Sequence, residues 1–252
     1  MSNNLIGRKV AKEASISFGG MGMGSLFRYL FSIMMARWLG PQMLGIYSLG
    51  NAITRIGEIF GIMGLDNGVL RYVSREKEKN DNVRNSIYSS IKMGFISSIF
   101  IGLLLYFSSD WIVLNLFNED EFLSTVIKVY ALTLPFTVTT LIASFATQGF
   151  KILKYKVFVN QIINPFTLLL TMILSYLFFG VNVAILAPTV VSAVFGFFLI
   201  LHYLNSFVDV SVSKVLNAKF DNKILRFSLP LMFVSAIGII MHWTDIIMFG
   251  KF

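Results

Sequence analysis

Long apolar stretches, each closed by polar or charged residues, recur along the whole chain. A helix rises 1.5 Å per residue, so about 20 apolar residues can cross the roughly 30 Å hydrocarbon core of a bilayer. The stretches of about this length lie at residues 14–36, 44–66, 90–112, 125–148, 157–179, 183–204 and 227–249. The pattern predicts an all-α polytopic membrane protein with about seven transmembrane helices.

The composition is also that of a membrane protein. Of the 252 residues, 56% are hydrophobic and 13% are charged, whereas soluble domains carry about 25% charged residues. Cysteine is absent and His202 and His242 are the two histidines, so we expect no cofactor and no metal site. The first stretch follows basic residues, as in a signal peptide, but its length and its lack of a small-residue cleavage site predict an uncleaved helix.

The basic residues alternate between the two sides of the predicted membrane. With the N-terminus inside, 16 of the 21 Lys and Arg residues fall in the cytoplasmic segments 8–12, 71–92, 151–156 and 214–226. The positive-inside rule therefore predicts a cytoplasmic N-terminus in the cell membrane. This distribution also explains the net charge of +8 without a nucleic-acid partner.

Two kinds of connection predict the domain organisation. Short outer turns at residues 40–41 and 180–182 predict antiparallel helix hairpins, and the basic inner connection 71–89 predicts a solvated loop or an interfacial helix. The longer polar segment 205–226 separates six predicted spans from the seventh. We therefore predict a six-helix transmembrane bundle at 1–212, with 213–252 forming a cytoplasmic connection and the first helix of an incomplete second bundle.

Arg28, Arg55 and Glu58 lie in the interior of the first two apolar stretches. An ionised side chain near the bilayer centre costs roughly 2.5 to 3.5 kcal/mol, so such residues usually face a wet cavity or a partner. Arg28 lies 12 residues before the turn at Gly40 and Arg55 lies 15 after it, which places both at similar depth. Glu58 is at i+3 from Arg55 and can pair with it, leaving a net charge of +1 that favours an anionic group such as phosphate. The alternative is a structural ion pair without a ligand.

Polar side chains also recur at helical spacing inside the apolar stretches, so that each set shares one helix face. Helix packing alone explains a single Ser or Thr, but the whole set favours a shared hydrophilic cavity. The clearest set is Asn160, Asn164, Thr167, Thr171 and Ser175. The candidate substrate-binding residues are Arg28, Asn51, Arg55, Glu58, Thr140, Ser144, Asn160 and Asn164.

Other residues suggest packing or ion coupling. Gly20 and Gly24 have the spacing that lets two helix backbones approach closely, while Pro135 and Pro165 permit kinks within spans. His242 and Asp245, at i and i+3 in the seventh stretch, are candidates with Glu58 for binding a coupling proton or cation. A solvated surface charge is the alternative for Asp245, which lies near the outer end of its span.

Three groups of short motifs stand at the ends of predicted helices. Ala-Arg-Trp-Leu-Gly-Pro lies at 36–41 and is followed by Gly-Ile-Tyr-Ser-Leu at 45–49. Gly-Leu-Asp-Asn-Gly lies at 64–68 with Arg71, and Phe-Ser-Leu-Pro lies at 227–230 with Trp243, Asp245 and Gly250. In this order the motifs resemble the first loop and the start of the second helix, the end of that helix, and the helix that opens the second half of Wzx-like polysaccharide flippases, a branch of the multidrug/oligosaccharidyl-lipid/polysaccharide exporter superfamily.

This resemblance implies a fold of two pseudo-symmetric bundles of about six helices each, so the chain is expected to be a fragment or to assemble with another chain. It implies movement of a polyprenyl-diphosphate-linked oligosaccharide from the inner to the outer leaflet by alternating access, with membrane lipids as further partners and no enzymatic step. The alternatives are a cation-coupled multidrug extruder of the same superfamily and a membrane scaffold subunit without transport.

Overall fold

The computed structural model describes residues 2–75, 81–117 and 121–249, and every regular element in these ranges is a helix. The elements are α1 (Ser2–Trp38), α2 (Pro41–Ile62), α3 (Leu65–Arg75), α4 (Asp81–Ile112), the π-helix η1 (Val113–Phe117), α5 (Glu121–Ala131), α6 (Leu134–Gly149), α7 (Leu153–Val157), the π-helix η2 (Phe158–Ile163), α8 (Asn164–Phe179), α9 (Val181–Asn205), α10 (Val212–Asn217) and α11 (Asn222–Phe249).

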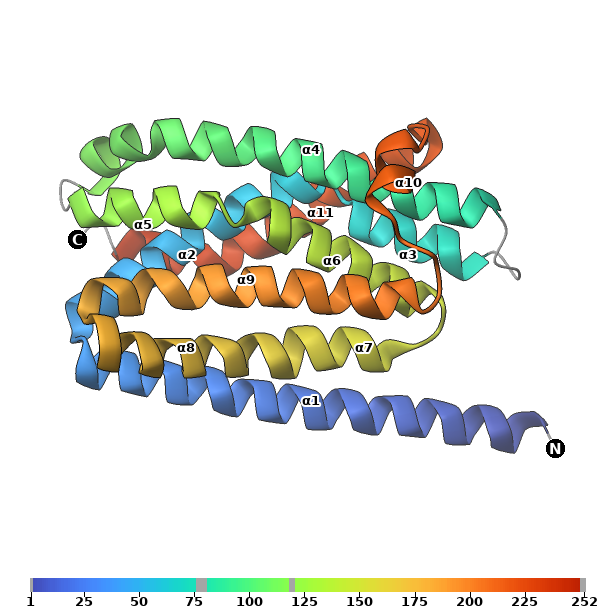
Figure 1. The fold of residues 1–252 in the computed structure, drawn as a ribbon, viewed down its shortest axis with the longest axis horizontal. Coiled ribbons are helices and arrows are strands. Elements are labelled where there is room, and N and C mark those ends of the chain that lie inside the picture. The colour runs from blue at the N-terminus through green and yellow to red at the C-terminus, as the bar shows by residue number, and fades with distance from the viewer. Residues whose placement is uncertain (1, 76–80, 118–120, 250–252) are drawn as a thin grey trace.

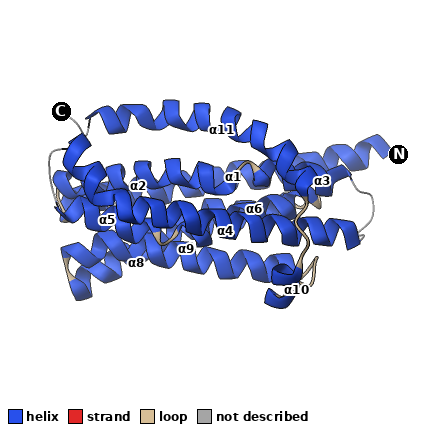
Figure 2. Ribbon diagram, turned by 90° about the horizontal axis from the view of Figure 1, so that it is seen from above, coloured by secondary structure: helices blue, strands red, loops and turns tan. Residues whose placement is uncertain are grey.

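The long helices run side by side along one axis, as Figure 1 shows. The N-terminal end of α1, the C-terminal end of α3, α7 and α10 gather toward one end of this bundle, where the basic connections lie. Helix α11 packs against α2 and α3, and Figure 2 shows α10 on the side of the bundle away from α11.

The two predicted short turns are confirmed, while their position on the outer side of the membrane stays a prediction. Helix α1 ends at Trp38 and α2 begins at Pro41, while α8 ends at Phe179 and α9 begins at Val181. Gly40 and Gly180 have φ of 94° and 85°, a backbone region that other residues rarely adopt. Glycine therefore lets the chain reverse within two residues at both turns.

Several predicted spans differ from the helices. The stretch 44–66 is not one helix, because α2 ends at Ile62 and the left-handed residues Met63 (φ 53°) and Gly64 (φ 70°) redirect the chain into α3. The stretch 125–148 is divided into α5 and α6, which meet at an angle of 44°. Pro135 lies in the first turn of α6, where its missing N–H costs no hydrogen bond.

Within the described ranges, three helical segments are long and apolar enough to cross a membrane, namely Asp81–Phe117, Leu153–Phe179 and Val181–Asn205. The bent pair α5 and α6 is a fourth if it forms one span. The chain is therefore an all-α polytopic membrane protein, while the number seven, the N-terminal orientation and the domain boundary at 212–213 stay predictions. Residues 71–75 and 81–89, expected as a solvated loop or an interfacial helix, are the end of α3 and the start of α4.

The buried apolar side chains form two main clusters. One joins α3, α4, α6 and α9 around Val69, Ile87, Ile142 and Ile200. The other joins α2, α5 and α9 around Ile53, Tyr130 and Ile185. Helices α6 and α9 pack directly against each other, and both contribute side chains to the first cluster.

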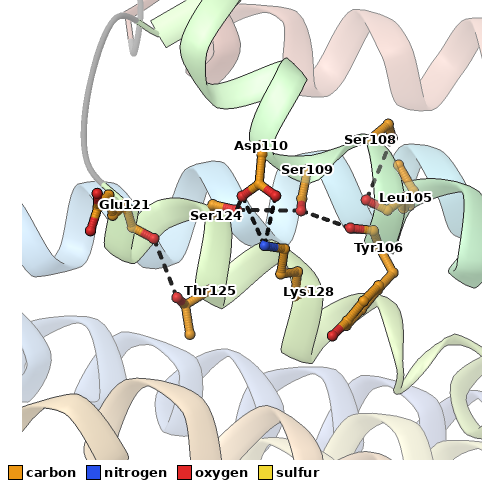
Figure 3. A network of polar contacts seen from close by, with 9 residues as sticks. All are labelled: Leu105, Tyr106, Ser108, Ser109, Asp110, Glu121, Ser124, Thr125 and Lys128. Carbon is orange, nitrogen blue, oxygen red and sulfur yellow. Dashed lines mark hydrogen bonds and ion pairs between the residues drawn. The ribbon is translucent and has the colours of Figure 1, made fainter.

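A polar network connects the C-terminal part of α4 with α5 (Figure 3). The Lys128 ammonium lies 2.8 Å from both carboxylate oxygens of Asp110. Ser124 donates a hydrogen bond to Asp110, and the Ser109 hydroxyl bonds the Tyr106 carbonyl at 2.8 Å. The network orients α5. Tyr130, near the C-terminal end of α5, lines the cavity inside the bundle.

Candidate functional site

A cavity of about 430 Å³ lies inside the bundle, among α1, α2, α5, α6, η2, α8 and α9. Its volume is in the range of ordinary ligand pockets. Seven of the eight candidate substrate-binding residues line it, although they come from four separate segments of the sequence. These are Arg28, Asn51, Arg55, Glu58, Thr140, Asn160 and Asn164.

The eighth candidate, Ser144, is fully buried one turn further along α6 than Thr140. It is not among the residues that line the cavity, so a direct contact of Ser144 with a substrate stays a prediction. The Asn160 amide donates a hydrogen bond of 2.9 Å to the Ser144 hydroxyl. Ser144 therefore orients Asn160, which does line the cavity.

Arg55 and Glu58 form the predicted pair within α2, with 2.6 Å between Nη1 and Oε2. Glu58 is only 5% exposed, and its other oxygen, Oε1, is buried without a hydrogen-bond partner among the described residues. A buried carboxylate oxygen without a partner is unfavourable, because the lost hydration is not replaced. This oxygen is therefore an available acceptor beside the cavity.

The second guanidinium, that of Arg28, is held differently. Its Nη2 lies 3.4 Å from Oε1 of Gln161, and within the described part of the chain it has no carboxylate partner. Among the described lining residues the charged groups are Arg28, Arg55 and Glu58. The cavity wall therefore carries a net charge of +1, as the spacing of these residues predicted.

Close backbone contacts bring Arg28 to this position. A Cβ at Gly24 would lie 2.0 Å from the Gln161 carbonyl oxygen, and one at Gly20 would lie 2.2 Å from the Val157 side chain. The prediction that these two glycines permit close helix packing is confirmed, and the partner is the segment of α7 and η2. Arg28 follows Gly24 by one turn, so this contact directs its side chain toward the cavity.

The partner segment is the π-helix η2, which ends immediately before Asn164 and Pro165. Proline has no N–H for the preceding turn, and the wider π-turn accommodates that missing bond. The π-turn places Asn160 and Asn164 on the cavity wall. On the other side of Asn164, Gly196 of α9 makes room for its amide, because a Cβ there would lie 2.5 Å from Asn164 Oδ1.

Of the polar set that begins at Asn160, only Asn160 and Asn164 line the cavity. Thr167, Thr171 and Ser175 do not line it. In the region of α8 beyond Asn164, Phe31 and Met35 of α1 pack against Met172 in an apolar cluster.

Sequence reasoning missed several lining residues, including Tyr47, Thr54, Tyr130 and Thr133. Helical spacing could have indicated Tyr47, because Tyr47, Asn51 and Arg55 recur every four residues on one face of α2. The Tyr130 hydroxyl donates a 2.8 Å hydrogen bond to a backbone carbonyl of α9, a contact that no local pattern indicates.

Of the three candidate ion-coupling residues, only Glu58 can be placed relative to the cavity. Glu58 lies at the cavity, whereas the side chains of His242 and Asp245 in α11 lie outside the described residues. Their proposed role stays a prediction. Within the described ranges, no group of three or more His, Cys, Asp and Glu side chains is arranged to hold a metal ion.

Comparisons with known proteins identify the family. The model of the family described as "Polysaccharide biosynthesis protein" matches residues 10–252. A solved structure named protein A superposes with a TM-score of 0.59 at 15% identity, over 97% of this chain and 63% of that one, so the likeness concerns the fold. No curated protein matches the chain significantly in sequence. The chain therefore belongs to the polysaccharide biosynthesis protein family, that of the Wzx-like flippases in the multidrug/oligosaccharidyl-lipid/polysaccharide exporter superfamily, and it is a multi-pass membrane protein.

Proposed function

We propose that this chain takes part in moving a polyprenyl-diphosphate-linked oligosaccharide from the inner to the outer leaflet of the cell membrane. The observation that carries the proposal is that two guanidinium groups, of Arg28 and Arg55, line one cavity with a single carboxylate. A diphosphate requires concentrated positive charge, and the guanidinium fork binds its oxygens with two parallel hydrogen bonds.

The remaining lining residues suit the sugar part of such a substrate. Asn51, Thr140, Asn160 and Asn164 offer neutral donors and acceptors around the arginines, and these can bond sugar hydroxyls without adding charge. Asn164 Oδ1 is buried without a hydrogen-bond partner among the described residues, so a hydroxyl donor there would satisfy it. The lipid tail would stay in the bilayer while the polar headgroup occupies the cavity.

The proposed movement is alternating access between two bundles. The chain spans 63% of the solved structure that it resembles, and in this proposal the pathway is completed by further helices from the same protein or from another chain. Glu58 is the candidate for coupling transport to an ion, because its buried Oε1 can accept a proton or contact a cation. The energy would then come from an ion gradient or from the membrane potential.

The test is flipping of a fluorescent polyprenyl-diphosphate oligosaccharide in vesicles that contain the full-length protein. Arg28→Ala removes the guanidinium without a carboxylate partner and is expected to lower the rate about tenfold to a hundredfold, the equivalent of one or two charge-assisted hydrogen bonds. Arg28→Lys, which keeps the charge but loses the fork, should be intermediate. The matched control is Arg84→Ala, which removes an exposed arginine paired with Asp81.

Unchanged flipping in a correctly inserted, stable Arg28→Ala protein would contradict the headgroup site. Two other outcomes would favour the alternative functions. Proton-coupled efflux of a dye without sugar flipping would identify a multidrug extruder. Absence of both activities in the unmodified full-length protein would identify a scaffold subunit.

A further inference from the structure

The segment between α9 and α11 presents an apolar stripe outside the bundle. Val212 and Leu216 lie one turn apart in α10, Phe220 follows three residues beyond the end of this helix, and the three side chains are 76%, 62% and 55% exposed. Successive residues of a helix are 100° apart, so the polar side chains of α10 lie on a different helix face from Val212 and Leu216. These polar residues are Ser213, Lys214 and Asn217. The segment is therefore amphipathic, with an apolar face that nothing in the described chain covers.

Helix α10 is held firmly against α4, so the exposed stripe has a defined position. Lys92 of α4 donates hydrogen bonds to the carbonyls of Leu216 (2.6 Å) and Ala218 (3.2 Å), which caps the C-terminal end of α10. The same ammonium lies 4.8 Å from the centre of the Phe220 ring. On the protein side, Val215 and Ala218 join the core cluster that contains α4.

The position on α4 indicates the depth of the stripe in the membrane. One turn beyond Lys92, α4 begins a band of exposed apolar side chains at Phe95, Ile96, Ile99 and Phe100, within the segment that is long and apolar enough to span. Lys92 thus marks the edge of the hydrocarbon-facing surface, where long basic side chains reach the headgroups. Helix α10 lies at this edge.

The charges around the stripe complement an anionic surface. Residues 209–226 contain four basic and two acidic residues, and both acids already have partners. Asp209 pairs with Lys214, and Asp221 accepts a 3.0 Å hydrogen bond from Ser86. Lys219 and Lys223 lie in this exposed segment without a carboxylate partner among the described residues.

We propose that the segment 212–220 is a membrane-surface anchor. Val212, Leu216 and Phe220 insert into the headgroup boundary of the leaflet at this end of the bundle, and the neighbouring lysines bind anionic phospholipid headgroups. Amphipathic helices with this arrangement lie in the interface plane and depend on both apolar burial and anionic lipid. The anchor holds the connection to α11 at the bilayer surface and does not depend on what the cavity transports.

The chain has no cysteine, so a single introduced cysteine can carry a nitroxide spin label at a chosen position. We would label Leu216→Cys and, as the matched control on the polar side of the same helix, Asn217→Cys. The full-length protein is reconstituted in vesicles of phosphatidylcholine and phosphatidylglycerol, and collision with oxygen and with a water-soluble nickel chelate is measured. The label at 216 should be about tenfold less accessible to the chelate than the label at 217, and readily accessible to oxygen.

The lipid dependence is tested on the same label. In vesicles of phosphatidylcholine alone, or with Lys219→Ser and Lys223→Ser combined, the label at 216 should become more mobile and more accessible to the chelate. Equal chelate access at 216 and 217 would overturn the proposal. Protection of position 216 from both oxygen and chelate would also overturn it, since protein, such as a second copy of the chain, would then cover the stripe.

Discussion

Substitution of Gly24 by alanine tests the backbone contact that positions Arg28. A Cβ at this position would lie 2.0 Å from the Gln161 carbonyl oxygen, and real Cβ contacts are essentially never under 3.0 Å. The neighbouring atom is backbone and cannot rotate away, so α1 and η2 must separate by about 1 Å or distort locally. Overpacking costs about 1–3 kcal/mol, and so short a contact with backbone belongs to the upper part of this range, about 2–3 kcal/mol. Alanine gains about 1 kcal/mol over glycine in helix propensity.

The expected net loss is therefore about 1–2 kcal/mol for Gly24→Ala. The matched control is Gly22→Ala, two residues away in the same helix, where a Cβ would meet nothing within 4 Å. This control should be neutral or slightly stabilised, because only the propensity term remains. The pair of variants separates the effect of packing from the effect of removing a glycine.

The assay is thermal unfolding in detergent, followed by the fluorescence of the three tryptophans. At about 2–4 °C per kcal/mol for a chain of this size, Gly24→Ala should unfold about 2–8 °C below the unmodified protein. A Tm for Gly24→Ala equal to that of Gly22→Ala would refute the close contact. Because Arg28 lies one turn further along α1, Gly24→Ala should also lower sugar flipping, whereas Gly22→Ala should not.

Three further predictions concern single polar groups. Glu58→Gln keeps the size of the Glu58 side chain but removes the negative charge beside Arg55. The rate of flipping should then no longer respond to an imposed proton gradient. A retained response would exclude Glu58 as the coupling group. Tyr130→Phe removes a buried hydrogen bond and should lower the free energy of unfolding by about 1 kcal/mol, and an unchanged Tm would show that the bond is not formed. Asp110→Asn breaks the partly exposed pair with Lys128, so Tm should fall only slightly, and the difference from the unmodified protein should shrink as salt is added. A decrease in Tm that does not depend on salt would contradict a solvated pair.

Much of the fold and part of the candidate site follow from local patterns. The spacing of Arg55 and Glu58 predicts their pairing because residues three apart on a helix are neighbours. The spacing of Gly20 and Gly24 predicts a close helix approach for the same geometric reason. The hairpin turn at Gly40 is predicted because glycine tolerates positive φ. Each of these depends on residues close together in the sequence.

Other features depend on contacts between distant segments, and no local pattern contains them. The stretch 44–66 looks continuous by its apolar residues, but its division at Met63 and Gly64 accompanies the packing of α11, since a Cβ at Gly64 would lie 2.3 Å from the Ser228 carbonyl oxygen. Ser144 was expected at the cavity because helical spacing defines a face, yet spacing cannot say where along that face the cavity ends.

The sequence by itself determined that the chain is a helical, polytopic membrane protein, and it predicted that two arginines and one glutamate are available to a common site. Only the tertiary structure decided which surface faces that site. The π-turn before Pro165 and the contact of Gly24 with Gln161 bring Asn160, Asn164 and Arg28 to one cavity. The physical reason is that helical periodicity orients side chains about a single axis, whereas a cavity depends on how several axes pack against one another.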